Sequence, residues 1–249
     1  MNVGILERKE REKQMRRDTI VRAAEAVFFE KGLRAATLDE VAEKAEVSKG
    51  TIYLYFPSKE DLYCALITRG LRLLLTAFRE AKPEEVDPGQ ALDRLGAAYL
   101  EFSRRQSYLF RMLSAIESPA ITDKVSPSVF TELEEASNSV LGYVATFVQK
   151  GIDDGTFRRE VSAHEAVVLF WVSLSGILNL KQRSSMFGVT SALNADSIIQ
   201  AVDFDSLYAK CLTYLLNLLS KQETRPPDGR STARKRKGAL KQSRAVRKK

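Results

Sequence analysis

Apolar residues recur at helical spacing through most of the chain, and the strict alternation that is typical of strands is almost absent. The first clear stretch places Ile20, Ala24, Val27 and Phe28 on one face. It is followed by Gly32, a residue that readily adopts the backbone conformation that ends a helix. The pattern predicts an all-α chain whose first helix stops near this glycine.

Two short helices are expected next. Thr37 and Glu40 form the pattern of a capping box, in which each residue satisfies a free amide of the other at the start of a helix. Ser48 is the next good N-cap and would begin a third helix. That helix has to end before Pro57, because the residue preceding a proline is disfavoured in helical conformation.

The remaining helices are longer. A second capping-box pattern, with Ser58 and Asp61, predicts a fourth helix that extends to about Ala81, and the stretch Pro83 to Gly89 predicts a break after it. Three further apolar faces follow, and we expect them to form a helical core. They consist of Leu92, Leu95, Tyr99 and Phe102; of Leu109, Phe110, Met112, Leu113 and Ile116; and of Val140, Val144, Phe147 and Val148.

Two helices near the end of the chain are apolar on more than one side. They are predicted over Ala163 to about Gln182 and over Phe204 to Leu219. A surface helix needs only one apolar stripe, so these two predict burial against a second subunit. Two central helices of a monomeric bundle are the alternative. The longest uncharged stretch, 166–180, is shorter than the ~20 residues that span a bilayer, so no membrane association is expected.

The second and third helices have the dimensions of a helix-turn-helix unit. On the third helix, Ile52 and Phe56 are expected to face the bundle, which leaves the start of the helix exposed. A small glycine, a hydroxyl and a cation there could enter a DNA major groove, and a tyrosine and a lysine nearby could reach phosphates. The exposed residues are Lys49, Gly50, Thr51, Tyr53 and Lys59. A short amphipathic connector with solvent-facing polar residues is the alternative.

Charge is distributed unevenly. Residues 1–82 carry 16 Lys/Arg and 13 Asp/Glu, residues 83–224 carry 12 and 18, and residues 225–249 carry 11 and 1. Both ends are therefore basic and the middle is acidic, so a polyanion such as DNA would be drawn to the ends. The last segment has no apolar face, which predicts a disordered basic tail over residues 222–249. A solvated extension without a partner is the alternative.

Few residues suit catalysis or metal binding. Cys64 and Cys211 lack metal-ligand spacing, and His164 is the single histidine. The sequence has no Ser/His/Asp order, no glycine-rich phosphate loop and no HExxH motif. We therefore expect no enzyme activity, no cofactor and no metal. The charged N-terminus has no apolar signal core, and the two cysteines suit a reducing cytoplasm.

The segment from about Arg17 to Phe78 resembles the DNA-binding domain of the TetR family of transcriptional regulators. The family pattern ILxAAxxxFxxxGxxxxTxxxIAxxAGVSxGTxYxYFxSKExL is matched here by IVRAAEAVFFEKGLRAATLDEVAEKAEVSKGTIYLYFPSKEDLY. The similarity covers about a quarter of the chain. One departure is Glu46, where the family usually has glycine, a residue that tolerates positive φ far better.

The resemblance implies roles for individual positions of this sequence. Positions that contact the DNA backbone correspond to Thr37, Ser48, Lys49, Tyr53, Tyr55 and Lys59, and base-facing positions correspond to Gly50, Thr51 and Leu54. The resemblance and the charge pattern together predict three regions. An N-terminal arm with a three-helix DNA-binding domain spans 1–82, a helical ligand-binding and dimerisation bundle spans 83–221, and the basic tail follows from 222.

For the bundle, the resemblance implies a homodimer formed by the last two helices and a ligand cavity, and the aromatic and methionine content suits a small apolar or aromatic effector. The candidate pocket residues are Tyr99, Phe102, Phe110, Leu113, Phe147 and Trp171. A filled bundle would use the same residues. The expected protein is a cytoplasmic repressor that binds a palindromic double-stranded operator and is released by its ligand. An architectural protein that coats DNA with little sequence specificity and no ligand response is the alternative.

Overall fold

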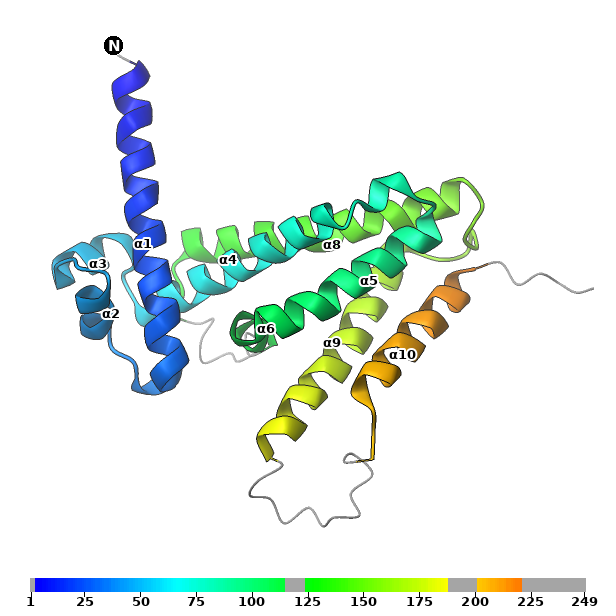
Figure 1. Ribbon diagram of the computed structural model, residues 1–249. Coiled ribbons are helices and arrows are strands. Elements are labelled where there is room, and N and C mark those ends of the chain that lie inside the picture. Colours follow the sequence, from blue (N-terminus) through cyan, green and yellow to red (C-terminus); the bar gives the residue numbers. More distant parts are fainter. Residues whose placement is uncertain (1–2, 115–123, 188–200, 221–249) are drawn as a thin grey trace, which may run out of the picture.

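The computed structural model describes residues 3–114, 124–187 and 201–220, and nearly all of these residues are helical, which confirms the all-α prediction. The helices are joined mostly by short turns, and a single 3-10 turn, η1, precedes α5 (Figure 1). In chain order the elements are α1 (Val3–Ala35), α2 (Leu38–Lys44), α3 (Lys49–Tyr55), α4 (Lys59–Glu80), η1 (Pro83–Glu85), α5 (Pro88–Arg105), α6 (Ser107–Ser114), α8 (Pro127–Asp153), α9 (Ala163–Phe187) and α10 (Phe204–Leu219).

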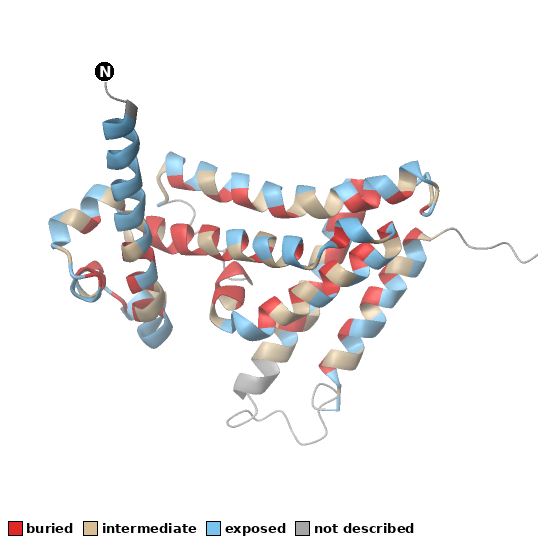
Figure 2. Ribbon diagram, turned by 45° about the horizontal axis from the view of Figure 1, so that its top comes forward, coloured by how far each residue is buried: buried red, intermediate tan, exposed pale blue. Residues whose placement is uncertain are grey.

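Helix α1 is longer than its apolar pattern predicts. Its buried face begins at Ile20, yet the helix begins at Val3, and residues 4–16 are exposed on all sides. This part of α1 projects from the rest of the molecule (Figures 1 and 2). At the other end Gly32 has φ 72° and ψ 163°, so the helix is interrupted at the glycine that the sequence indicated.

The predicted helix caps form, with one correction. Thr37 and Glu40 make the reciprocal capping box, and Ser48 and Ser58 each accept a backbone N–H of the following turn. The second capping box is only half present, because the Asp61 carboxylate does not return to the backbone N–H of Ser58. It accepts hydrogen bonds from the Ser58 hydroxyl and from the start of α8.

Helix α4 connects the two parts of the molecule. Its first turns are buried against α1, and its length then lies beside α8 (Figure 1). Helices α5, α6 and α9 complete the bundle, and the buried side chains follow the inward faces of all these helices (Figure 2). Gly96 lets α10 approach α5 closely, because a Cβ at this position would lie 2.5 Å from the Leu212 side chain.

Helices α9 and α10 pack side by side and keep apolar side chains on their outer surface. Val172 is 61% exposed and Tyr214 is 66% exposed. Among the residues whose burial is described, the large exposed apolar side chains of these two helices are called the outer stripe below: Val168, Leu169, Val172 and Leu180 on α9, with Leu207, Tyr214 and Leu218 on α10. Among the described residues, Ala163–Gln182 is long and apolar enough to cross a membrane by length and composition alone, a property that core helices of soluble proteins share.

Candidate nucleic-acid interface

The turn between α2 and α3 keeps its expected geometry although it lacks a glycine. Glu46 has φ 55°, in the left-handed region. Its N–H donates to the Glu43 carbonyl at 3.1 Å, and the Val47 N–H donates to the Ala42 carbonyl at 3.0 Å. These two bonds form a Schellman motif, the usual way in which a helix ends on glycine. The glutamate therefore preserves the helix-turn-helix angle at the expense of a strained backbone.

One face of α3 is anchored and the other is free. Ile52 and Phe56 are fully buried and fix the helix on the core. On the opposite side Leu54 is 80% exposed and Tyr53 is 46% exposed. No acidic residue occurs in α3. An exposed leucine on a two-turn helix without acidic side chains suits an apolar contact with a base edge, such as a thymine methyl group.

The start of α3 is held by two hydroxyl groups. The Ser48 Oγ accepts the Thr51 N–H at 3.1 Å and lies 2.8 Å from the Thr51 Oγ. Between them, Gly50 is exposed, and a Cβ built on it would meet only the Ser48 Oγ, at 3.8 Å. Packing within the described residues therefore does not require a glycine, although glycine costs a helix about 1 kcal/mol relative to alanine. A close approach by another molecule would explain it.

Lys49 is paired with a residue that sequence reasoning did not identify. Its Nζ lies 2.7 Å from the Asp39 carboxylate, and this hydrogen bond raises the pKa of the lysine. Both side chains are exposed, so the pair contributes little to stability. The lysine could exchange this carboxylate for a phosphate at small cost.

Lys59 occupies a different environment from that of a free surface cation. Its Nζ donates to the carbonyls of Arg34 and Ala36, at 3.2 and 3.1 Å. The ammonium therefore supports the corner between α1 and α2, and one of its three N–H groups remains for a phosphate. Of the other predicted residues, Thr37 is exposed at its cap, whereas Tyr55 is half-buried against the core.

Arg17 is a second residue at this end of the molecule that the sequence pattern did not single out. Its guanidinium lies 5.1 Å from the centre of the Phe56 ring and makes two hydrogen bonds to Glu132 of α8, at 2.9 and 3.1 Å. It thereby joins α1, the end of α3 and the bundle. Only the long-range contacts identify this role, because Arg17 follows a run of exposed charged residues and nothing in the local sequence distinguishes it from them.

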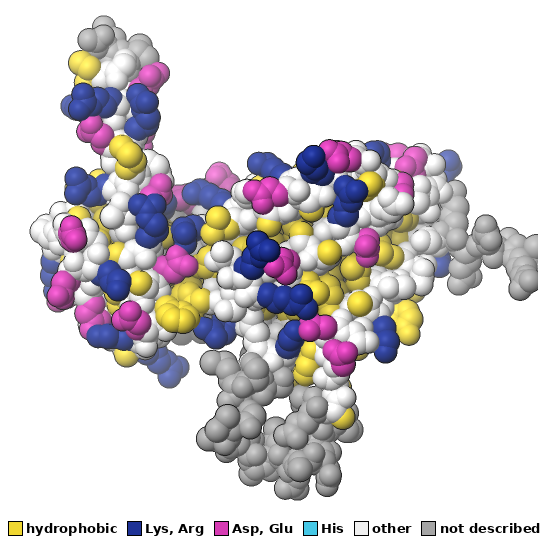
Figure 3. Space-filling model, in the orientation of Figure 1, with side chains coloured by type: hydrophobic (Ala, Val, Ile, Leu, Met, Phe, Trp, Pro, Cys, Tyr) yellow, Lys and Arg dark blue, Asp and Glu magenta, His cyan; other side chains and the backbone are white. Residues whose placement is uncertain are grey.

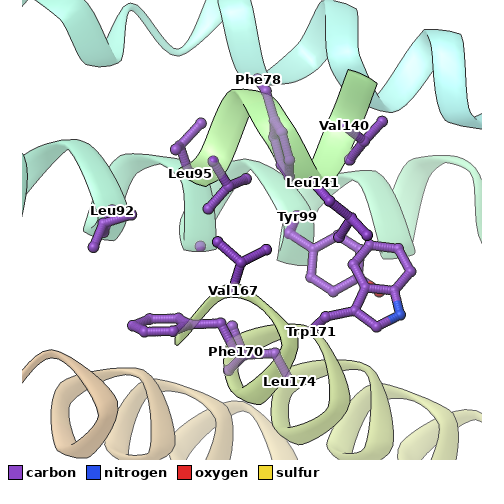
Figure 4. A pocket seen from close by; sticks show the side chains of 12 residues that line it. Phe78, Leu92, Leu95, Tyr99, Val140, Leu141, Val167, Phe170, Trp171 and Leu174 are labelled. Carbon is purple, nitrogen blue, oxygen red and sulfur yellow. The ribbon is translucent and has the colours of Figure 1, made fainter. Parts of the chain in front are cut away.

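The bundle contains two adjoining apolar cavities. The first, of about 50 Å³, lies between α5, α8 and α9 (Figure 4), and the second, of about 180 Å³, lies toward α4 and α6. Both are lined by Val140, Leu141 and Trp171. Tyr99 also lines the first cavity, with its ring 5.4 Å from that of Trp171, and Leu113 lines the second.

The other three predicted pocket residues line neither cavity. Phe102 faces a surface groove between α4 and α5. Phe110 packs against Tyr99, and Phe147 packs edge-on against Tyr143, so both are core residues. Ile116 and the basic tail lie outside the described residues.

Comparison with known proteins places this geometry in a family. Residues 20–66 match the family model of bacterial regulatory proteins, tetR family. The chain is 30% identical over 131 residues to the HTH-type transcriptional activator FasR of Mycolicibacterium smegmatis. This alignment covers 52% of this chain and 59% of FasR. The chain is 29% identical over 170 residues to the HTH-type transcriptional repressor BepR of Brucella suis. This second alignment covers 66% of this chain and 78% of BepR.

A solved structure shares the fold. The transcriptional regulator FadR from Bacillus subtilis, in complex with stearoyl-CoA, superposes with a TM-score of 0.58 at 19% identity. The superposition covers 81% of this chain and 98% of that chain, so the likeness extends over the helix-turn-helix region and the bundle. Residues 20–66 therefore belong to the tetR family of bacterial regulatory proteins, and the chain shares its overall fold with FadR.

Proposed function

We propose that this protein is a cytoplasmic transcriptional repressor that binds a palindromic operator as a homodimer and leaves it when an apolar small molecule binds. The observation that carries the proposal is Gly50, an exposed glycine on an anchored helix, at a position where packing within the described residues would accept a larger side chain. The site supports DNA as the partner, because the free face of α3 combines a cation and hydroxyl groups with an absence of acidic residues.

Within this proposal the residues of the site have two kinds of role. Residues at the start of α3 and on its free face read base edges in the major groove, and residues around them hold phosphates. Gly50, Thr51 and Leu54 form the first group. Thr37, Ser48, Lys49, Tyr53, Tyr55 and Lys59 form the second. A DNA-binding region at 1–82 and a regulatory region at 83–221 follow from the same assignment.

The outer stripe supports a second copy of the chain as the partner of α9 and α10. Large exposed apolar surfaces on soluble proteins mark interaction sites. Gly176, on the exposed side of α9 between Val172 and Leu180, has no atom within 4 Å of an added Cβ. A small residue at the centre of an apolar stripe lets another helix approach closely. Two copies related by a two-fold axis would present two recognition helices, as a palindrome requires.

The cavities support an apolar effector. Among the described residues that line the two cavities, Ser137 and Tyr99 carry hydroxyl groups, and the others are aliphatic, aromatic or glycine. Both cavities are below the roughly 300–1,000 Å³ of typical ligand pockets, so the effector has to widen them. Trp171 is the largest of the three side chains that border both cavities, and its movement would join them. The stearoyl-CoA in FadR from Bacillus subtilis supports a long hydrocarbon chain as the first effector class to test.

Helix α8 is the proposed connection between effector and DNA. Val140 and Leu141 on α8 line both cavities, and the other end of the helix is bonded to the DNA-binding region. There Ser126 donates to Asp61 of α4, and Glu132 accepts from Arg17 of α1. A widened cavity that displaces α8 would therefore move the recognition helix. Repression as the direction of control is supported by the broader alignment with BepR.

Two experiments test the proposal, one with DNA and one with candidate effectors. Selection from a random duplex library with the full chain should yield an inverted repeat. Thr51→Ala should change the preferred half-site, whereas Tyr53→Phe should weaken all sites alike.

The effector is tested by fluorescence. Free fatty acids of increasing length and their CoA thioesters should change the fluorescence of Trp171, the only tryptophan. Linkage requires that a true effector binds more weakly by the same factor when the operator is present. Selection without an enriched sequence would refute the proposal.

A further inference from the structure

The projecting part of α1, residues 3–16, carries a row of cations without partners. Lys9, Lys13 and Arg16 are spaced four and three residues apart, so they lie on one face of the helix. Within the described part of the chain, none of the three makes a hydrogen bond or an ion pair. By contrast, Arg8 of the same helix pairs with Glu12, and Arg11 bonds to the Glu7 carbonyl.

This row points toward the side of α1 that packs on the helix-turn-helix region. At 3.6 residues per turn, Ile20 and Val27 continue the line of Lys9, Lys13 and Arg16. Both of these residues are buried in the core shared with α2 and α4. The cations therefore extend the inward face of α1 beyond the edge of the domain. The helix leaves the domain beside Phe56, the C-cap of α3, where Arg17 covers the ring.

The length and composition of the projection fit a nucleic-acid backbone. Fourteen helical residues extend about 20 Å, which matches about six base pairs at 3.4 Å each. Figure 3 shows Lys and Arg side chains along the projection, interspersed with Asp and Glu. Its exposed large apolar residues, Ile5, Leu6 and Met15, do not share a face, so the helix lacks the seam that a coiled coil with a second copy needs.

We propose that residues 3–16 form a second DNA-contacting surface, which lays Lys9, Lys13 and Arg16 along the phosphates that flank each half-site. The inference rests on the proposed function, because it needs the recognition helix to dock on the same duplex. The surface formed by residues 3–16 adds a contact that is independent of base sequence. The extension would thus raise affinity and salt dependence without changing the operator that α3 selects.

The chain offers a matched control for this proposal. Lys9→Ala/Lys13→Ala removes two cations from the proposed face, and Arg8→Ala/Arg11→Ala removes two cations that lie outside this face of the same helix. Both variants change the net charge equally, and alanine preserves helical propensity. The basic tail and the recognition helix are unchanged in both, so any difference between the variants reports which face of the extension meets DNA.

The experiment measures affinity against salt concentration for the full-length protein on two duplexes. One carries the selected operator with ten base pairs of flank on each side, and the other ends at the half-sites. On the long duplex, Lys9→Ala/Lys13→Ala should flatten the slope of log affinity against log salt by up to about 1.8 per bound chain, since each lost phosphate contact accounts for about 0.9. Arg8→Ala/Arg11→Ala should leave it close to that of wild type, and on the short duplex the three proteins should be alike.

The outcomes distinguish a failure of the proposed function from a failure of the contact made by residues 3–16. If no protein prefers the operator over random duplex, the proposed function itself fails. If all bind the operator and the two variants give equal slopes on the long duplex, the function stands and the extension is not a DNA-contacting surface with this orientation. A difference that persists on the short duplex would also overturn the inference, because the contact would then lie within the half-site.

Discussion

The carboxylate of Asp61, in the first turn of α4, accepts hydrogen bonds from the backbone N–H and the hydroxyl of Ser126 at the start of α8, at 2.7 and 2.9 Å. Asp61 is 1% exposed, and the Ser58 hydroxyl donates to its other oxygen at 2.8 Å. The side chain of Ser126 makes no capping bond of its own to α8. One buried carboxylate therefore joins the N-cap serines of two helices, one from the DNA-binding region and one from the bundle, and it places a negative charge at the N-terminus of α8.

Removing this carboxylate should be costly. Asp61→Ala leaves the Ser126 N–H and two hydroxyls without their acceptor, and we expect a loss of about 2–3 kcal/mol in the free energy of unfolding. Ser126→Ala removes one hydroxyl donor and should cost about 1 kcal/mol. Urea unfolding of both single variants and the double variant checks this. Additive losses in the double variant would contradict the contact, because coupled residues are non-additive.

The left-handed Glu46 predicts an unusual stabilising substitution. Glu46→Gly should raise the free energy of unfolding by about 1 kcal/mol, since glycine removes the strain of positive φ at a small entropic cost in the unfolded chain. Glu46→Ala is the control, because it removes the charge and keeps the Cβ. Equal stabilities of the two variants in urea would show that backbone strain at this turn is negligible.

Gly50 should separate stability from DNA binding. Gly50→Ala should stabilise α3 by about 0.5–1 kcal/mol, because helical propensity rises and the Cβ meets no obstacle within the chain. The same Cβ should lower operator affinity about tenfold or more by blocking close approach to the bases. Gly142→Ala, at an equally unobstructed glycine on α8, should stabilise without affecting affinity. Unchanged DNA binding by Gly50→Ala would remove the main support for the interface.

The helical pattern and the caps were predictable from sequence because they are local. Periodicity located the start of α10 at Phe204 and its end at Leu219, and hydroxyl residues located the starts of α2, α3 and α4. The strain at Glu46 was also predictable, because a glutamate occupies the position where the family pattern has glycine. The projecting turns of α1 were missed because a helix that buries nothing leaves no apolar period.

Contacts between distant residues could not be predicted in the same way. Asp61 had the sequence pattern of a local capping residue, yet besides Ser58 it binds Ser126, which is 65 positions away. Lys59 had the pattern of a free cation, and its commitment to two carbonyls depends on where α1 ends. Among the apolar side chains, nothing in the spacing distinguishes Trp171, which borders both cavities, from Phe147, which fills the core. That distinction depends on how several helices pack together.

The outer stripe predicts the oligomeric state. Val172→Glu places a charge at the centre of the proposed dimer surface and should convert the protein to monomers with a normal helix content, because this side chain is 61% exposed within one chain. Leu6→Glu, at a residue 60% exposed on α1, should leave the dimer intact. Sedimentation equilibrium distinguishes these outcomes. A wild-type monomer at all concentrations would contradict the assignment of the stripe.

The pair between Lys181 and Asp205 predicts a dependence on pH. The Lys181 ammonium, 2.6 Å from Asp205, and the Arg104 guanidinium at 3.0 Å hold the pKa of this carboxyl below its usual range. A pKa that is lower in the folded state adds stability above the unfolded pKa of about 4, and this stability is lost as the pH falls through the folded value. Asp205→Asn should therefore lower Tm at pH 6 and approach wild type near pH 3. A constant difference in Tm would contradict the ion pair.

In the proposed complex, two copies of α3 read two related half-sites on one duplex. A hydroxyl-radical footprint of the full-length protein on its selected operator, at physiological salt, measures this arrangement. We predict two protected segments related by an inverted repeat, with centres about 34–36 Å apart or a multiple of that distance. Both segments should be lost together in Val172→Glu at concentrations that saturate the wild type. Uniform protection along the whole fragment, or equal protection of unrelated fragments, would contradict the claim and favour a protein that coats DNA without sequence preference.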